Sequence, residues 1–125
     1  MIRTKIAAAF GAAALAGLGI AATATPASAA WTDCSSGALC AYLGDNGAGD
    51  PGEVFGDNTN LLQYTKFNNA ESVYNNGNDC NVRVYNGTGY TGSSFLLLRG
   101  YTIGNLDSYS GGIFADDLAS NRWVC

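Results

Sequence analysis

The segment most informative about the fold is Tyr85-Asn86-Gly87-Thr88-Gly89-Tyr90-Thr91-Gly92. It places two aromatic residues five positions apart, with a glycine two positions beyond the second. Residues 81–85, just before it, alternate apolar with other side chains, as in a strand that is buried on one face. The Asn, Gly and Thr residues between the two tyrosines are typical of a tight turn. The stretch therefore predicts a β-hairpin.

A weaker copy of this pattern lies in the first half of the chain. Tyr42 is followed by the same spacing, but Gly47 stands where the second aromatic is expected. Later in each half comes a pair of acid or amide residues with a serine three positions beyond, in residues 68–72 and 116–120. The chain therefore predicts a duplicated unit of about 45 residues.

The other segments also favour short strands. Residues 61–64, 94–99 and 122–124 are β-prone, and the apolar run from Phe95 to Leu98 is short enough for a strand that is buried on both faces. No segment keeps a helical period over three turns. Many short strands at close spacing predict an all-β sandwich or barrel.

Residues 1–29 have the pattern of a cleaved signal peptide. Arg3 and Lys5 precede an apolar run over residues 6–22, and Ala27-Ser28-Ala29 fits a signal peptidase site. A retained membrane anchor is the alternative interpretation. We expect a secreted, extracellular protein whose single domain covers residues 30–125 and which has no membrane contact after cleavage.

The predicted mature part is acidic. Four cations face ten carboxylates, a net charge of −6; the cations are Lys66, Arg83, Arg99 and Arg122. This charge repels polyphosphate, and no basic stripe is interleaved with aromatics, so nucleic-acid binding is not expected.

The four cysteines all lie in the predicted mature part: Cys34, Cys40, Cys80 and Cys125. An even number in an exported chain indicates two disulfides. Of the three possible pairings, we favour Cys34 with Cys40, which are close in sequence, and Cys80 with Cys125, which ties the C-terminus to the middle of the chain. A zinc site is the less favoured alternative, because the sequence has no histidine and no CxxC pair.

The repeated pattern resembles the Greek-key motif of the βγ-crystallins, in which an aromatic pair forms a corner over a folded hairpin and the glycine adopts positive φ. The resemblance implies an all-β fold: a small two-sheet Greek-key sandwich of two repeated motifs. Motif one would cover residues 34–79 and motif two residues 80–125.

A second resemblance lies just after the signal peptide. Cys34-Ser35-Ser36-Gly37-Ala38-Leu39-Cys40-Ala41-Tyr42 is similar to the opening of the Streptomyces metalloproteinase inhibitor family. Those proteins are secreted inhibitors of thermolysin-type proteases with a crystallin-like fold. The resemblance implies a peptidase inhibitor whose partner is an extracellular protease.

The crystallin resemblance also implies a calcium site. Calcium takes six to eight oxygen ligands, which amides, carboxylates and hydroxyls supply. The implied ligands come from both halves: Asn68, Asn69, Ser72, Asp116, Asp117 and Ser120. Val73 and Asn121 stand where the family motif has a second serine. The alternative is that these residues only brace turns.

Catalysis is not expected, because the sequence contains no histidine and disulfides would leave no thiolate nucleophile. Inhibition needs only a rigid loop offered to a protease cleft. The candidate contact loop is Asn78, Asp79, Cys80 and Asn81, and the alternative is an ordinary linker between the motifs.

We therefore expect a monomeric, secreted metalloprotease inhibitor. A calcium-binding structural or stress protein is the second hypothesis, and a secreted killer-toxin-like antimicrobial is the third.

Overall fold

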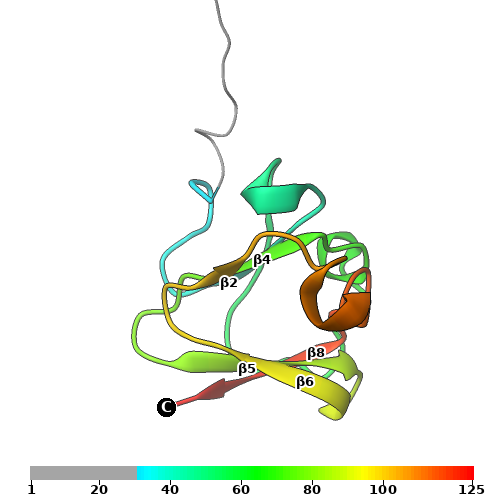
Figure 1. The fold of residues 1–125 in the computed structure, drawn as a ribbon. Coiled ribbons are helices and arrows are strands. Elements are labelled where there is room, and N and C mark those ends of the chain that lie inside the picture. The colour runs from blue at the N-terminus through cyan, green and yellow to red at the C-terminus, as the bar shows by residue number, and fades with distance from the viewer. Residues whose placement is uncertain (1–30) are drawn as a thin grey trace, which may run out of the picture.

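The computed structural model describes residues 31–125, so the predicted signal peptide and residue 30 lie outside the described residues. The chain forms two antiparallel sheets, one stacked above the other (Figure 1). Within residues 31–125, no helix has the length and apolar character needed to cross a membrane. The elements are, in chain order, β2 (Leu39–Tyr42), η2 (Asp45–Gly47), β3 (Gly52–Val54), α1 (Thr65–Asn68), β4 (Ser72–Asn75), β5 (Asn81–Gly87), β6 (Thr91–Leu97), β7 (Thr102–Ile103), η3 (Tyr109–Gly112) and β8 (Ser120–Val124).

The sheet order shows the two intertwined halves. One sheet has the order β3-β2-β4-β7, and the other has the order β6-β5-β8. In the first sheet β2 pairs with both β3 and β4, and in the second β5 pairs with both β6 and β8. Strand β7 belongs to the second half in sequence but pairs with β4 of the first half. The predicted two-sheet Greek-key fold is confirmed.

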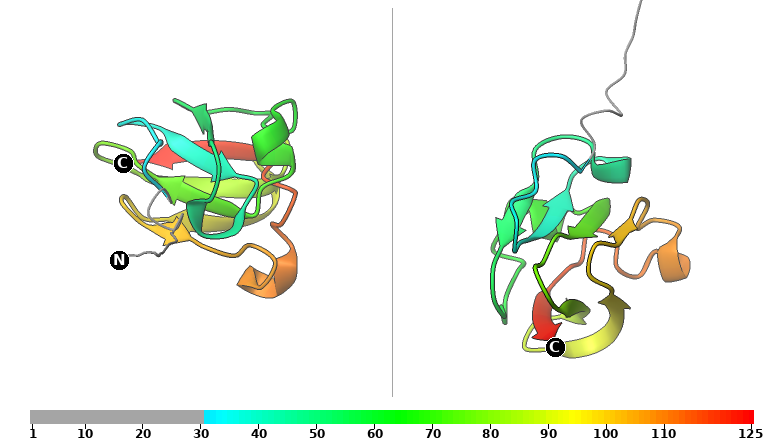
Figure 2. Two further views of the ribbon diagram at one scale, coloured as in Figure 1. Left: turned by 90° about the horizontal axis from the view of Figure 1, so that it is seen from above. Right: turned by 90° about the vertical axis from the view of Figure 1, so that its left-hand side faces the viewer.

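Figure 2 shows the two sheets as separate layers, and both contribute inward-facing residues to the main hydrophobic core. Alternate residues of the strands point inward, as the period of two requires: Leu39, Ala41, Val73, Val82, Val84, Phe95 and Leu97. Phe67 on α1 and Phe114 after η3 close the core at its sides, and the rings of Phe95 and Phe114 meet edge to face at 4.7 Å between centroids.

A second cluster covers the outer face of the first sheet. Cys34, Ala38, Cys40 and Tyr42 are buried there, with Trp31 and Tyr74 packed against them. The segment that precedes β2 thus turns back over the sheet. Both predicted disulfides are confirmed, Cys34 with Cys40 and Cys80 with Cys125.

Two expected strands differ from the structure. Residues 61–64 form a turn in which the amide of Tyr64 donates to the carbonyl of Leu61 at 3.0 Å, so the chain enters α1 and not a strand. Residues 94–97 of the expected strand at 94–99 form the end of β6, and residues 98–99 lie beyond it; only Phe95 and Leu97 are buried. Leu96 is 38% exposed because it lies on the outer face of the sheet, and Leu98, after the end of the strand, is 40% exposed.

Candidate functional site

Both serines of the repeated motifs fasten a folded hairpin to its sheet. The hydroxyl of Ser120 donates to the carbonyl of Gly87 at 2.7 Å and accepts from the amide of Tyr90 at 3.0 Å. The hydroxyl of Ser72 makes the same pair of bonds in the first half, at 2.7 Å to Gly44 and 2.9 Å from Gly47. Both serines are fully buried. Because both hydroxyls are already hydrogen-bonded to the hairpins, a cation bound at these motifs would be coordinated mainly by other oxygen atoms.

The two hairpins carry different aromatic corners. In the second half, Tyr85 and Tyr90 contact each other at 5.7 Å between ring centroids. In the first half, the position of the second aromatic is Gly47, and Trp31 fills the space from outside the motif. Its ring lies 5.3 Å from that of Tyr42, and a Cβ built on Gly47 would come within 2.6 Å of it. The N-terminal segment therefore completes the corner that the first motif lacks.

The predicted calcium residues come from two segments that the structure brings side by side. The amide of Asp116 donates to the carbonyl of Ala70 at 3.1 Å, and the amide of Leu118 donates to that of Phe67 at 3.3 Å. The side chains of Asn68, Asn69 and Asp116 are exposed, and that of Asp117 is half-buried. The amides and carboxylates of the two halves thus share one region of the surface.

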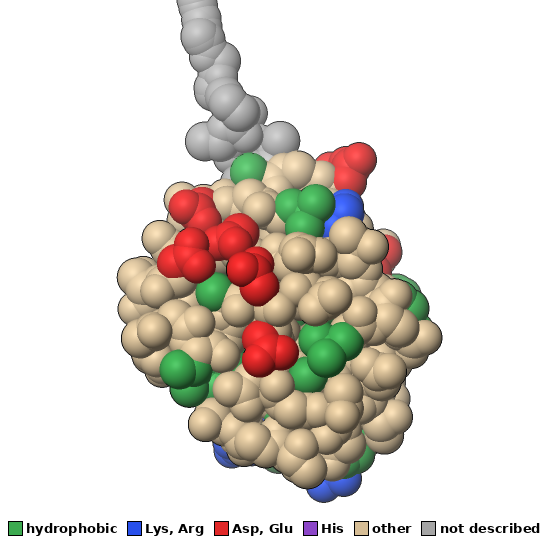
Figure 3. Space-filling view, turned by 90° about the vertical axis from the view of Figure 1, so that its right-hand side faces the viewer, with side chains coloured by type: hydrophobic (Ala, Val, Ile, Leu, Met, Phe, Trp, Pro, Cys, Tyr) green, Lys and Arg blue, Asp and Glu red, His purple; other side chains and the backbone are tan. Residues whose placement is uncertain are grey.

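Sequence reasoning missed two carboxylates in this region, Glu71 and Asp107. Burial raises the pKa of Glu71 to about 7, and hydrogen bonding with Asp107 and Asp116 and repulsion from their charges act in the same direction. Burial also raises the pKa of Asp117. Glu71 is part of the motif at residues 68–72, so its position beside the expected ligands could have been predicted. No sequence pattern includes Asp107. Acidic side chains gather on one face of the domain (Figure 3).

Glu71 makes stability depend on pH. Its pKa is about 7 in the native state against 4.5 in an unfolded chain, so the native state keeps a proton that the unfolded state has released. In EDTA we expect the wild-type protein to lose stability as pH rises from about 4.5 to about 7. Glu71→Gln should be more stable than wild type at pH 8, by on the order of 1 kcal/mol, and equal to it at pH 4. Urea unfolding of both proteins across this range measures the difference, and Asp50→Asn at an exposed site is the control. Parallel pH profiles for Glu71→Gln and wild type would contradict the prediction.

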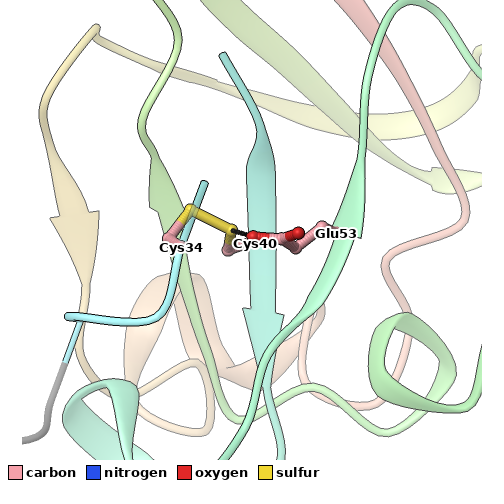
Figure 4. Close-up of side chains that lie close together, drawn as sticks. All are labelled: Cys34, Cys40 and Glu53. Carbon is pink, nitrogen blue, oxygen red and sulfur yellow. Dashed lines mark hydrogen bonds between the residues drawn. A yellow bond between two sulfur atoms is a disulfide. The ribbon is translucent and has the colours of Figure 1, made fainter. Parts of the chain in front are cut away.

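A second group of potential metal ligands contains two cysteines that form a disulfide. Among residues 31–125, Cys34, Cys40 and Glu53 form the one set of three such side chains whose ligand atoms lie within 4.8 Å of one another (Figure 4). Because the two sulfurs form a disulfide, they offer no thiolate to a metal. The carboxylate of Glu53 instead accepts hydrogen bonds from the amide and the hydroxyl of Ser35. This contact holds the N-terminal segment against β3.

Residues 78–80 of the candidate contact loop lie between β4 and β5, Asn81 begins β5, and the loop is fixed from several sides. Its Cys80 is bonded to Cys125. The buried amide of Asn75 donates to the carbonyls of Cys80 at 3.2 Å and Leu97 at 3.0 Å. At the other side, the hydroxyl of Ser36 donates to Oδ1 of Asn78 at 2.8 Å. Asn78 and Asp79 remain exposed at the tip. The loop thus presents exposed residues on a fixed backbone.

A shallow depression of about 200 Å³ lies beside this loop. It is lined by Gly37, Gly77, Asn78, Asp79, Cys80 and Trp123. The indole of Trp123 is fixed by its hydrogen bond to the carbonyl of Gly56 at 2.9 Å. The loop therefore has a concave surface next to it that can receive part of a partner.

Solved structures with the same fold are βγ-crystallins of low sequence identity. One concerns the evolution of the eye lens beta-gamma-crystallin domain fold; it has a TM-score of 0.62 and 16% identity, covering 74% of this chain and 89% of that chain. A beta gamma crystallin from Ciona intestinalis has a TM-score of 0.57 and 20% identity, covering 70% of this chain and 100% of its own. A betagamma-crystallin from an archaeon has a TM-score of 0.53 and 17% identity, covering 72% and 100%. These likenesses establish the fold.

The family comparison is more specific. No curated protein matches the chain significantly. The model of peptidase inhibitor family I36 matches residues 27–97, which is more than half of the chain. The match includes both cysteines of the first disulfide, the candidate contact loop and the start of the second motif. It confirms the resemblance to the Streptomyces metalloproteinase inhibitors, and it supports a non-enzymatic role at the level of the family. The chain belongs to peptidase inhibitor family I36.

Proposed function

We propose that this protein is secreted and inhibits an extracellular metalloprotease by presenting the loop at Asn78, Asp79, Cys80 and Asn81 to the protease cleft. Membership of an inhibitor family supports a protease as the partner. The observation that carries the proposal is the way in which the loop is held, by the Cys80–Cys125 disulfide at one side and by Ser36 at the other. A loop that is already ordered loses little conformational entropy when it binds, so more of the contact energy is available as affinity.

The same attachments would hold the loop together if a protease cleaved it. If a protease cleaved a bond near Asp79, Cys80 would stay tied to Cys125, and Asn76 would stay tied to the segment before β2. The amide of Gly37 donates to the carbonyl of Asn76 at 2.8 Å, and the amide of Asn76 donates to the carbonyl of Ala38 at 3.0 Å. The two new ends would remain close together, which slows their release and favours resealing of the bond.

A titration of a thermolysin-type protease with this protein tests the proposal. We expect stoichiometric loss of protease activity, and we expect Asp79→Arg to raise the inhibition constant by about tenfold or more because Asp79 is at the loop tip. Asp50→Arg makes the same charge change before β3, away from the loop, and should inhibit like wild type. Full protease activity in the presence of excess protein would refute the proposed function. If the protein inhibited a serine protease but no metalloprotease, it would still be a protease inhibitor, but the proposed metalloprotease specificity would be wrong.

Calcium binding is the second candidate function, and the interaction of Glu71 with Asp107 and Asp116 is the observation that favours it. Carboxylate oxygens suit calcium, and a bound cation would relieve the repulsion among these three groups. The ligand atoms of this trio are not all within 4.8 Å of one another, so the side chains would have to move together to share an ion.

A thermal melt in EDTA and then in millimolar calcium tests this candidate. An ion that binds only to the native state raises the melting temperature. We expect a rise of several degrees for wild type and a smaller rise for Glu71→Gln, which lacks the central carboxylate. Equal melting temperatures for the wild-type protein in EDTA and calcium would exclude calcium binding.

A further inference from the structure

The outer face of the sheet β6-β5-β8 carries two arginines side by side. Arg83 on β5 is directly opposite Arg122 on β8, and Leu96 on β6 is opposite Arg83 on its other side. Like charges that face each other across antiparallel strands are unfavourable. Among residues 31–125, neither arginine has a carboxylate within ion-pair distance. Nη1 of Arg83 donates to the hydroxyl of Ser94 at 3.2 Å, and Arg122 lies 4.0 Å above the ring of Tyr90.

The internal repeat shows what lies over the equivalent place in the other sheet. Arg83 precedes Tyr85 by two residues, as Cys40 precedes Tyr42, and Arg122 follows Ser120 by two, as Tyr74 follows Ser72. The rows Leu96-Arg83-Arg122 and Glu53-Cys40-Tyr74 therefore correspond, and both follow from the strand registers.

The row Glu53-Cys40-Tyr74 is covered by residues 31–36 of the same chain. Cys34 is bonded to Cys40, Ser35 donates two hydrogen bonds to Glu53, and the ring of Trp31 lies 5.8 Å from that of Tyr74. A short segment that contains two turns thus lies across three strands of the first sheet. In residues 31–125, no such segment crosses the row Leu96-Arg83-Arg122. Leu96 is 38% exposed, and Val124 on the same face is 42% exposed.

We propose that the row Leu96-Arg83-Arg122 is a docking site for an extended acidic segment of a partner protein. The site suits carboxylates because guanidinium groups form paired hydrogen bonds with them. Strands β5, β6 and β8 contain no Asp or Glu, so no carboxylate of this sheet competes for the two arginines. In Figure 3, Lys and Arg side chains are seen at the lower edge of the domain, and another lies near the top beside acidic side chains.

The neighbouring side chains define the occupant further. The exposed Leu96 and Val124 offer apolar contact beside the charges, which suits a polypeptide with alternating acidic and apolar residues. Residues 1–30 of this chain contain no Asp or Glu and so have no carboxylate side chain for this site. Residues 1–30 therefore do not fit the site, and the occupant we propose is another protein. Val124 lies opposite Asn81, so the site adjoins one end of the loop at residues 78–81.

Fluorescence anisotropy with a labelled peptide of alternating glutamate and leucine tests the site, using the disulfide-bonded protein expressed from the full sequence. We expect binding that weakens with salt, and a loss of about tenfold in affinity for each of Arg83→Gln and Arg122→Gln. Lys66→Gln removes the same charge from α1 and should bind like wild type. Unchanged affinity in the Arg83→Gln/Arg122→Gln double variant would overturn the proposal.

Three further results would also overturn it. Equal binding of a glutamine–leucine peptide would show an apolar surface with no role for carboxylates. Tighter binding of tripolyphosphate than of the acidic peptide would assign the arginines to phosphate. Self-association in sedimentation that disappears in the double variant would make a second copy of this chain the occupant.

Discussion

Replacing both Cys80 and Cys125 with serine is expected to lower the free energy of unfolding by about 4 kcal/mol. The bond joins residues 45 positions apart, so its loss greatly increases the conformational freedom of the unfolded chain. Small domains are stable by about 5–15 kcal/mol, so this loss is a large fraction of the total stability and the variant should melt at a clearly lower temperature. The end of β8 and the loop at residues 78–81 should be affected together, because the bond connects them.

The other disulfide provides the matched control. Cys34 and Cys40 are only 6 positions apart, so the Cys34→Ser/Cys40→Ser variant should lose about 2 kcal/mol. Urea unfolding followed by far-ultraviolet circular dichroism measures both variants. If the two double variants unfold at the same urea concentration, closure of the long loop is not the source of the stability.

Replacing Trp31 with alanine is expected to lower the free energy of unfolding by about 3 kcal/mol. Trp31 precedes the first strand, yet its ring contacts Tyr42 at 5.3 Å and Tyr74 at 5.8 Å and covers Gly47. Its removal uncovers the fully buried Tyr42 and leaves the hairpin at η2 without its aromatic cover. Near-ultraviolet circular dichroism should lose intensity, and urea unfolding should shift to lower concentration.

Phe55→Ala is the control for the Trp31 variant. Phe55 is 58% exposed, so its truncation should change stability by less than about 0.5 kcal/mol. A Trp31→Ala protein as stable as Phe55→Ala would show that the N-terminal segment only rests on the domain and that the first corner is complete without it.

The repeated motifs were sufficient to predict the fold and the two halves, because each motif encodes a local hairpin through the spacing of its aromatics and glycines. They were not sufficient for the details of the candidate site. Ser72 and Ser120 have the residue type of calcium ligands, but the structure uses both hydroxyls to fasten the hairpins. The calcium site remains a prediction, and any test of it should include the carboxylates of Glu71 and Asp107 as candidate ligands.

The amino-acid sequence was enough to predict the all-β class, the duplicated unit, the membership of an inhibitor family and the preferred cysteine pairing. These properties depend on residue types at short spacings, which a single chain displays directly. Only the tertiary structure showed that Trp31 replaces the missing aromatic at Gly47, that Glu71 meets Asp107 and Asp116, and that Arg83 faces Arg122. Each of these contacts joins residues that are distant in sequence, so it depends on the order and register of the strands in the folded sheets, which local patterns do not encode.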